Sequence, residues 1–190
     1  VKVRPGFALG SWATFKADGA QAVAHGDLVL TETEINPVIS ALQRHNFEIT
    51  ALHNHLIKAS PVVMYLHFWG HGQPAALAAA VREALGQTRT PLGPPAAGGA
   101  PAPDGFDAEQ FMSVIGLRGA VTNGVLGLSQ PRPEPIQMMG VTLPPSMGMA
   151  TAINVQATGA GQVAATGDFV MLADEVNPVA RALRTANIEI

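Results

Sequence analysis

Four of the six histidines of the chain lie in one stretch, ITALHNHLIKASPVVMYLHFWGHG, from Ile49 to Gly72. Imidazole is a common ligand of transition metals, and a site with three protein ligands leaves a coordination position open for water or a substrate. A single histidine on an apolar face is usually a hydrogen-bonded core residue, but a close group of three is harder to explain in that way. The stretch therefore predicts either a metal or catalytic site, or a cluster of structural hydrogen bonds.

The spacing of three of these histidines predicts where their side chains point. Successive side chains of a strand alternate between its two faces, so His53 and His55 of LHNHL are expected on the same face. His67 lies in VVMYLHFW, and the short connection between the two segments predicts that they are antiparallel neighbours. The three imidazoles would then converge on one ion, for which the ligand type predicts Zn or another transition metal (Cu, Fe or Ni).

Other polar residues near this stretch are weaker candidates. His71 is flanked by glycines and followed by a proline, so it is either a fourth ligand or a residue at the start of a helix. Glu32, Glu34 and Asp27 precede a predicted helix, and capping or turn roles are favoured for them, although Glu34 is also a conceivable proton acceptor. Two histidines stand apart and are expected in ordinary core or surface roles: His25 and His45.

Two long segments of the chain repeat one another. Gly26–Ile49 (GDLVLTETEINPVISALQRHNFEI) matches Gly167–Ile190 (GDFVMLADEVNPVARALRTANIEI) at a constant offset of 141, and the match extends upstream if one residue is inserted near Gly159. Asp27 recurs as Asp168 in this match. Such a repeat predicts two copies of one structural unit. Because each copy contains parts that the other lacks, the natural polypeptide is expected to be longer at both ends.

The hydrophobic pattern predicts the elements of each copy. In the first copy, strands are expected in FALGSWATFKA, QAVAHGDLVL, FEITALHNHL and SPVVMYLHFW, and helices over QPAALAAAVREALG and from near Asn36, with Pro37 at the first helical position. In the second copy, we expect a helix in DAEQFMSVIGL, strands in GVLGLSQP and PIQMMGVTL, and then strand, helix and strand over 167–190, with the helix beginning near Asn177. The predicted fold class is α+β, a tandem repeat of strand-strand-helix-strand-strand-helix units with mainly antiparallel sheets.

The predicted organisation is a first repeat over 1–89, a linker rich in Pro, Gly and Ala over 90–105, and a second repeat over 106–190. The first repeat is expected to be incomplete at its N-terminal side and the second at its C-terminal side. The linker residues offer little to bury, so Thr90–Pro103 is expected on the surface without regular structure.

Composition excludes several classes of partner. The chain has 190 residues, of which 47% are hydrophobic and 13% charged, and its net charge of −3 does not provide the basic surface that nucleic acid binding requires. No run of residues is long and apolar enough to predict a membrane-spanning helix. The absence of cysteine excludes disulfides and cysteine-ligated metal sites, so any metal must be bound by His, Asp, Glu or the backbone.

The long segment GDLVLTETEINPVISALQRHNFEITALHNHLIKASPVVMYLHFWGHG, together with PPSMGMATAINVQATGAGQVAATGDFVMLADEVNPV, resembles the LppY/LpqO family of bacterial lipoproteins and secreted proteins. The resemblance implies a tandem-duplicated domain of unknown activity in an exported protein, whether periplasmic, secreted or lipid-anchored. It also implies that the H-N-H pattern of His53, Asn54 and His55, and the M-H pattern that ends at His67, are recurring features. In that family the second copy carries its own H-N-H, which would follow Ile190.

Two functions from different classes remain open at this point. In the first, an exported protein binds a transition metal through His53, His55 and His67, and whether it is an enzyme is undecided. In the second, the protein is a noncatalytic interaction module of the cell envelope, with a protein partner or as a homo-oligomer, and its histidines are structural. Trp12 and Trp69 would then belong to an interface. The residues do not identify a small-molecule ligand.

Overall fold

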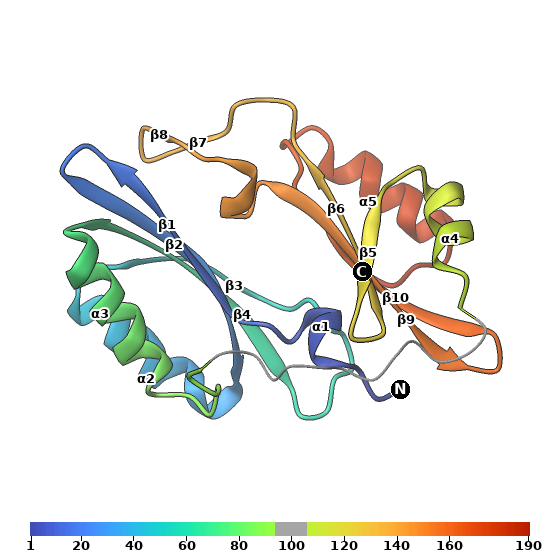
Figure 1. Cartoon of the computed structure of the whole chain (residues 1–190), viewed down its shortest axis with the longest axis horizontal. Helices are drawn as coiled ribbons and strands as arrows, with labels where there is room; N and C mark the ends of the chain where they lie inside the picture. The colour runs from blue at the N-terminus through green and yellow to red at the C-terminus, as the bar shows by residue number, and fades with distance from the viewer. Residues whose placement is uncertain (94–105) are drawn as a thin grey trace.

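The computed structural model describes residues 1–93 and 106–190, which form two similar α+β domains (Figure 1). All the strand pairs in both domains are antiparallel. The predicted fold class, tandem α+β units with antiparallel sheets, is therefore confirmed. The predicted linker, 90–105, falls largely outside the described residues. Its described part, 90–93, has no regular structure.

After a short helix, α1 (Pro5–Ala8), the first domain has the predicted order of strand, strand, helix, strand, strand and helix. The strand predicted in FALGSWATFKA begins only at Trp12, because α1 includes Phe7 and Ala8. Its strands lie side by side in the order β1 (Trp12–Asp18), β2 (Gln21–Thr31), β4 (Val63–Gly72) and β3 (Glu48–His53). Helices α2 (Glu32–Arg44) and α3 (Pro74–Leu85) lie on the side of this sheet that faces away from the second domain (Figure 1).

The two helices bury one face of the first sheet. Leu28 and Leu30 of β2, and Leu66 and Phe68 of β4, pack in the same apolar cluster as the inward residues of α2 and α3. Residues alternate across a strand, so the neighbours of these four residues in the sequence point to the other face. The opposite face of β2 and β4 therefore carries His25, Asp27 and His67, and it faces the second domain.

The second domain contains a sheet with the strand order β10 (Gln162–Asp168), β9 (Ala150–Gly159), β6 (Val125–Pro131) and β5 (Gly119–Thr122). Its helices are α4 (Ala108–Ile115) and α5 (Val176–Thr185). The prediction of one strand in PIQMMGVTL is wrong, because this segment forms a small hairpin of β7 (Gln137–Met138) and β8 (Val141–Thr142). Met139 and Gly140 both have positive φ angles, as a tight two-residue hairpin turn requires.

The repeat is visible in equivalent hydrogen bonds of the two domains. The backbone N–H of Val29 donates to Ser11 Oγ over 2.9 Å, and that of Val170 donates to Thr151 Oγ1 over 3.1 Å. Glu34 and Glu175 likewise accept from the backbone N–H three residues before each of them, over 2.8 and 2.7 Å. The two copies therefore share hydrogen bonds as well as sequence.

The helix boundary in the first copy differs from the prediction. Helix α2 begins at Glu32 because Thr31 and Glu34 form a capping box, and Pro37 lies inside the helix. Helix α5 begins at Val176, close to the predicted Asn177. The predicted closing strand forms in the first copy as β3, whereas residues 188–190 are not part of a strand.

Two short helices pack between the domains. Helix α1 (Pro5–Ala8) packs against β6 and β9 of the second domain, and it buries Phe7. The equivalent turn of 3₁₀ helix, η1 (Pro145–Met147), buries Met147 against Val23 and Trp69 of the first domain. Each domain thus places its own short helix on the inner face of the other.

No helix among the described residues is long and apolar enough to cross a membrane.

Candidate metal centre

The three predicted histidines meet on the face of the first sheet that is turned toward the second domain. His67 lies in the middle of β4, and His53 is the last residue of β3, the neighbouring antiparallel strand. His55 follows two residues later in the loop between these strands, beyond the end of β3. One ligand atom from each imidazole lies within 4.8 Å of the others. The three residues form a group that could hold a metal ion.

A bulge in β3 brings His53 to this face. Ile49 pairs with Phe68 and Ala51 pairs with His67, so one extra residue of β3 is accommodated between these two pairs. If residue 50 were paired regularly and not bulged, His53 would share the face of Ile49, which is covered by α2 and α3. β-bulges commonly redirect side chains near functional sites.

The imidazole rings are close enough to share a ligand. His53 Nε2 and His55 Nε2 are 2.8 Å apart, and the ring centres of His53 and His67 are 4.9 Å apart. The Nδ1 atom of His53 is buried and has no hydrogen-bond partner. Ligand atoms of one zinc ion, each ~2.0–2.2 Å from the metal, lie about 3–3.6 Å from each other, so shifts of less than ~1 Å would complete the arrangement.

Asp27 lies beside the histidines. It is inside strand β2 and not next to a helix end, so it does not cap a helix. In the pairing of β2 with β4, Asp27 is directly opposite His67. Its Oδ2 atom is 3.6 Å from His67 Nε2 and 3.9 Å from His55 Nε2, and its Oδ1 atom is buried without a hydrogen-bond partner. The favoured prediction of a capping or turn role for Asp27 is therefore wrong, whereas the same prediction for Glu34 is confirmed.

The electrostatics of the group favour neutral imidazoles. Burial, followed by the neighbouring His53 and His25, lowers the pKa of His67 to about 4. Burial also lowers the pKa of His55, although Asp168 acts in the opposite direction. Both rings are therefore neutral near pH 7, and a neutral ring nitrogen is the form that binds a metal.

The pKa of Asp27 is shifted in the opposite direction from those of the histidines. Burial raises the pKa of its carboxyl group to about 7, and the negative charge of Asp168 adds to this rise. Ionised Asp27 is thus unfavourable in this position unless a positive charge compensates it.

Aromatic side chains surround the site. The ring of Tyr65 stacks on His55, with ring centres 3.9 Å apart, and its hydroxyl donates to Ala8 O over 2.8 Å. Trp12 meets His67 edge to face. These contacts restrict the orientations of the imidazoles, and restricted ligand orientation is what a preorganised site needs.

The second domain also contributes to the site. Thr166 of β10 donates through its hydroxyl to His55 O over 3.1 Å. Two residues later, Asp168 Oδ2 is 3.8 Å from His55 Nε2. Farther along the His55 loop, Lys58 forms an ion pair with Glu189, with Nζ–Oε1 and Nζ–Oε2 distances of 2.6 and 2.9 Å. Thr166 and Glu189 of the second domain therefore both bind the loop that carries His55.

The remaining predicted candidates lie outside the group. His71 Nε2 lies 3.0 Å from Asp18 Oδ2, where β4 and β1 end. His45 contacts Glu83 on the surface, as expected for an ordinary role. His25 is buried, and its Nδ1–H donates to Phe68 O over 2.9 Å, so its expected core role fits. Its ring nevertheless lies beside that of His67, with centres 5.6 Å apart.

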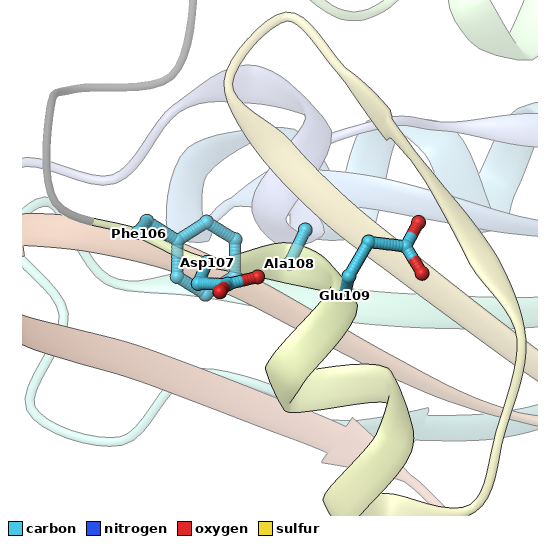
Figure 2. A pocket seen from close by; sticks show the side chains of 4 residues that line it. All are labelled: Phe106, Asp107, Ala108 and Glu109. Carbon is cyan, nitrogen blue, oxygen red and sulfur yellow. The ribbon is translucent and has the colours of Figure 1, made fainter.

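A surface pocket elsewhere carries no comparable chemistry. Among the described residues it is lined by Phe106, Asp107, Ala108 and Glu109, at the start of α4 (Figure 2). Asp107 caps this helix by accepting from the backbone N–H of Gln110 over 2.9 Å. The carboxylate of Asp107 thus has a structural role, and none of the three histidines borders the pocket.

Comparison of the chain with curated proteins and with solved structures found no match. A family model described as "Domain of Unknown Function (DUF1259)" matches residues 1–87 and 109–190. The two matched regions agree with the duplicated structure. The chain belongs to this family of domains of unknown function.

Proposed function

We propose that the protein binds a divalent transition metal through His53, His55 and His67. The observation that carries this proposal is the convergence of three imidazoles from β3, β4 and the intervening loop, with ligand atoms within 4.8 Å of one another. Three imidazoles suit Zn, Cu, Fe or Ni. If the three imidazoles are its only protein ligands, the ion would retain a position for water or a substrate oxygen, where it would act as a Lewis acid.

The test is a titration of protein that has been stripped with a chelator and then mixed with Zn²⁺ at pH 7.5 in a calorimeter. Wild-type protein should bind close to one ion per chain. His53→Ala and His67→Ala should weaken binding by about 100-fold or more, because each removes a ligand. His45→Ala is the matched control, since His45 lies on the surface with Glu83. Wild-type protein that binds neither Zn²⁺, Cu²⁺, Fe²⁺ nor Ni²⁺ would contradict the proposal.

One observation favours a structural role for the histidines instead. The 2.8 Å separation of His53 Nε2 and His55 Nε2 is that of a hydrogen bond in which one ring donates and the other accepts. In a noncatalytic interaction module this bond would fix the loop after β3. The same variants distinguish the two functions, because a structural bond predicts that His53→Ala lowers the melting temperature while the wild-type protein binds no metal.

We also propose that the full protein is exported and belongs to the LppY/LpqO family. The support is the sequence resemblance around the H-N-H segment at His53–His55, and the duplicated fold agrees with it. The test is expression of the natural gene with a C-terminal tag, followed by separation of cytoplasm, membranes and external fraction. Recovery of the protein in the cytoplasm alone would contradict export.

A further inference from the structure

The three histidines do not account for all the ligand-type atoms of the site. Asp27 is 5% exposed, and its Oδ1 atom is buried without a partner. Its other oxygen lies 3.6 and 3.9 Å from two of the imidazole nitrogens, which exceeds hydrogen-bond length. These separations are close to those expected between ligand atoms that bind one ion. A buried carboxylate beside two imidazoles, with one oxygen lacking a hydrogen-bond partner, is costly to ionise unless a cation joins it.

A second carboxylate reaches the same place from the other domain. Asp168 is the last residue of β10, and its Oδ2 atom is 3.8 Å from His55 Nε2. In the sequence repeat, Asp168 is the equivalent of Asp27. The two copies of one position therefore approach His55 from opposite domains. The hydrogen bond from Thr166 to His55 O places β10 at this distance from the loop.

The charges of the group match a divalent cation. Imidazoles bind a metal as neutral ligands, so two ionised carboxylates would give the ligand set two negative charges, which an ion such as Zn²⁺ cancels. Mixed nitrogen and oxygen ligands are typical of Zn²⁺, Fe²⁺ and related divalent ions.

We propose that Asp27 and Asp168 are further ligands of the metal, so that the site is shared by the two domains. This inference rests on the proposed function, since it assumes that the histidines bind an ion. It assigns a binding role to equivalent residues of the two repeats. The bound ion would then join the domains, with Asp27, His53, His55 and His67 from the first and Asp168 from the second.

The experiment compares charge-removing variants of chelator-stripped protein in titrations with Zn²⁺ and Co²⁺. Asp27→Asn should weaken Zn²⁺ binding by about 100-fold, and Asp168→Asn by at least about tenfold, because each removes an anionic ligand. Asp174→Asn is the matched control in the second domain, since Asp174 is exposed and also carries one charge. It should change the affinity by less than about twofold.

The visible absorption of bound Co²⁺ provides a readout that distant charge does not alter. Both Asp27→Asn and Asp168→Asn should change the position and intensity of the Co²⁺ bands, since these depend on the ligand set and coordination number, whereas Asp174→Asn should leave them unchanged. Asp168 is 49% exposed at its side chain, so its substitution is not expected to disturb folding. Asp168→Glu retains the carboxylate and should recover part of the affinity.

The outcomes separate this inference from the proposed function. Wild-type protein that binds none of Zn²⁺, Co²⁺, Cu²⁺, Fe²⁺ and Ni²⁺ would contradict both. Binding that depends on His53 and His67 but is unchanged in both aspartate variants would overturn the inference and leave the histidine site in place. A loss in Asp27→Asn alone, with Asp168→Asn equal to Asp174→Asn, would overturn the sharing of the site between domains.

Discussion

The carboxyl group of Asp27 lies inside the protein between His67 and His55, and one of its oxygens has no partner. Its pKa is raised to about 7 by burial and by Asp168. In the unfolded chain the pKa of an aspartate is close to 3.9. Between these two pH values the folded protein holds a proton that the unfolded chain releases. The contribution of Asp27 to stability therefore falls as the pH rises from about 4 to about 7.

Replacement of Asp27 by asparagine should make the metal-free protein more stable at pH 8. The amide does not ionise, so the cost of a buried charge disappears, and the gain should be on the order of 2–4 kcal/mol. At pH 4 the gain should vanish, because Asp27 is then protonated in the folded protein. Thermal melts in a chelating buffer from pH 4 to pH 8 measure this. Asp174→Asn should show no such pH dependence, and an Asp27→Asn variant that is less stable than wild type at pH 8 would refute the argument.

The sequence predicts the three histidines of the site but gives Asp27 too little weight. His53 and His67 could be chosen because they lie on consecutive strands with a short connection, and such strands usually pair. Asp27 meets His67 only through the pairing of β2 with β4, which are separated by α2 and β3. No local pattern specifies that pairing. The recurrence of Asp27 as Asp168 in the sequence repeat is compatible with a role of Asp27 in the site, but it is equally compatible with a turn.

At the level of elements, the periodicity of hydrophobic residues identifies helices and strands, but it locates their boundaries less accurately. The order of the elements from β1 to α3 in the first domain follows from the alternating and helical patterns. Pro37 indicated a helix start near Asn36, but the capping box of Thr31 and Glu34 starts α2 at Glu32. The pattern Thr-x-x-Glu at 31–34 is itself a start signal. The bulge in β3 has no comparable sequence signature, although it decides which face His53 occupies.

Glu34 should matter for stability and not for the metal site. Its carboxylate accepts from the backbone N–H groups of Thr31 and Arg89, both over 2.8 Å. Partial burial opposes ionisation, but these hydrogen bonds outweigh it and lower the pKa of Glu34. Glu34→Ala should therefore lower the free energy of unfolding by ~1–2 kcal/mol, as measured by urea denaturation, with Zn²⁺ affinity unchanged.

Glu32→Ala is the control for that prediction, because Glu32 occupies the same first turn but is exposed. It should cost less than about 0.5 kcal/mol. A large loss of Zn²⁺ affinity in Glu34→Ala, with the fold intact, would instead support a role of Glu34 as a metal ligand.

At the level of the whole molecule, each domain contributes a short helix that packs on the other domain, an arrangement called the helix exchange below. Trp69 and Val23 of the first domain form one buried cluster with Met147 and Leu143 of the second. Trp12 also lies close to Gly148, whose φ of +81° ends the turn of η1. The sequence repeat predicts two similar units but not the helix exchange, because the contacts join residues far apart in the chain. The two tryptophans contact residues of the second domain, so the interface that they line lies within the chain.

Because of the helix exchange, the two domains should unfold together. Phe7 and Met147 are equivalent in the repeat, both are buried, and each belongs to a short helix that packs on the other domain. Phe7→Ala and Met147→Ala should each reduce the free energy of unfolding by ~2–5 kcal/mol, as large-to-small substitutions in a core do. In a calorimeter each variant should melt in one transition at a lower temperature than wild type.

The exposed Met139 allows a matched control, since Met139→Ala removes the same atoms from a side chain that is 61% exposed. This variant should melt within about 1 °C of wild type, because it creates no cavity. Two separate transitions in the wild-type protein would show that the domains are independent. If Met147→Ala instead shifted only part of the heat absorption, the cluster around Trp69 would stabilise one domain alone. A single shared transition, raised further by Zn²⁺, is expected if a bound ion and the exchanged helices both join the two domains.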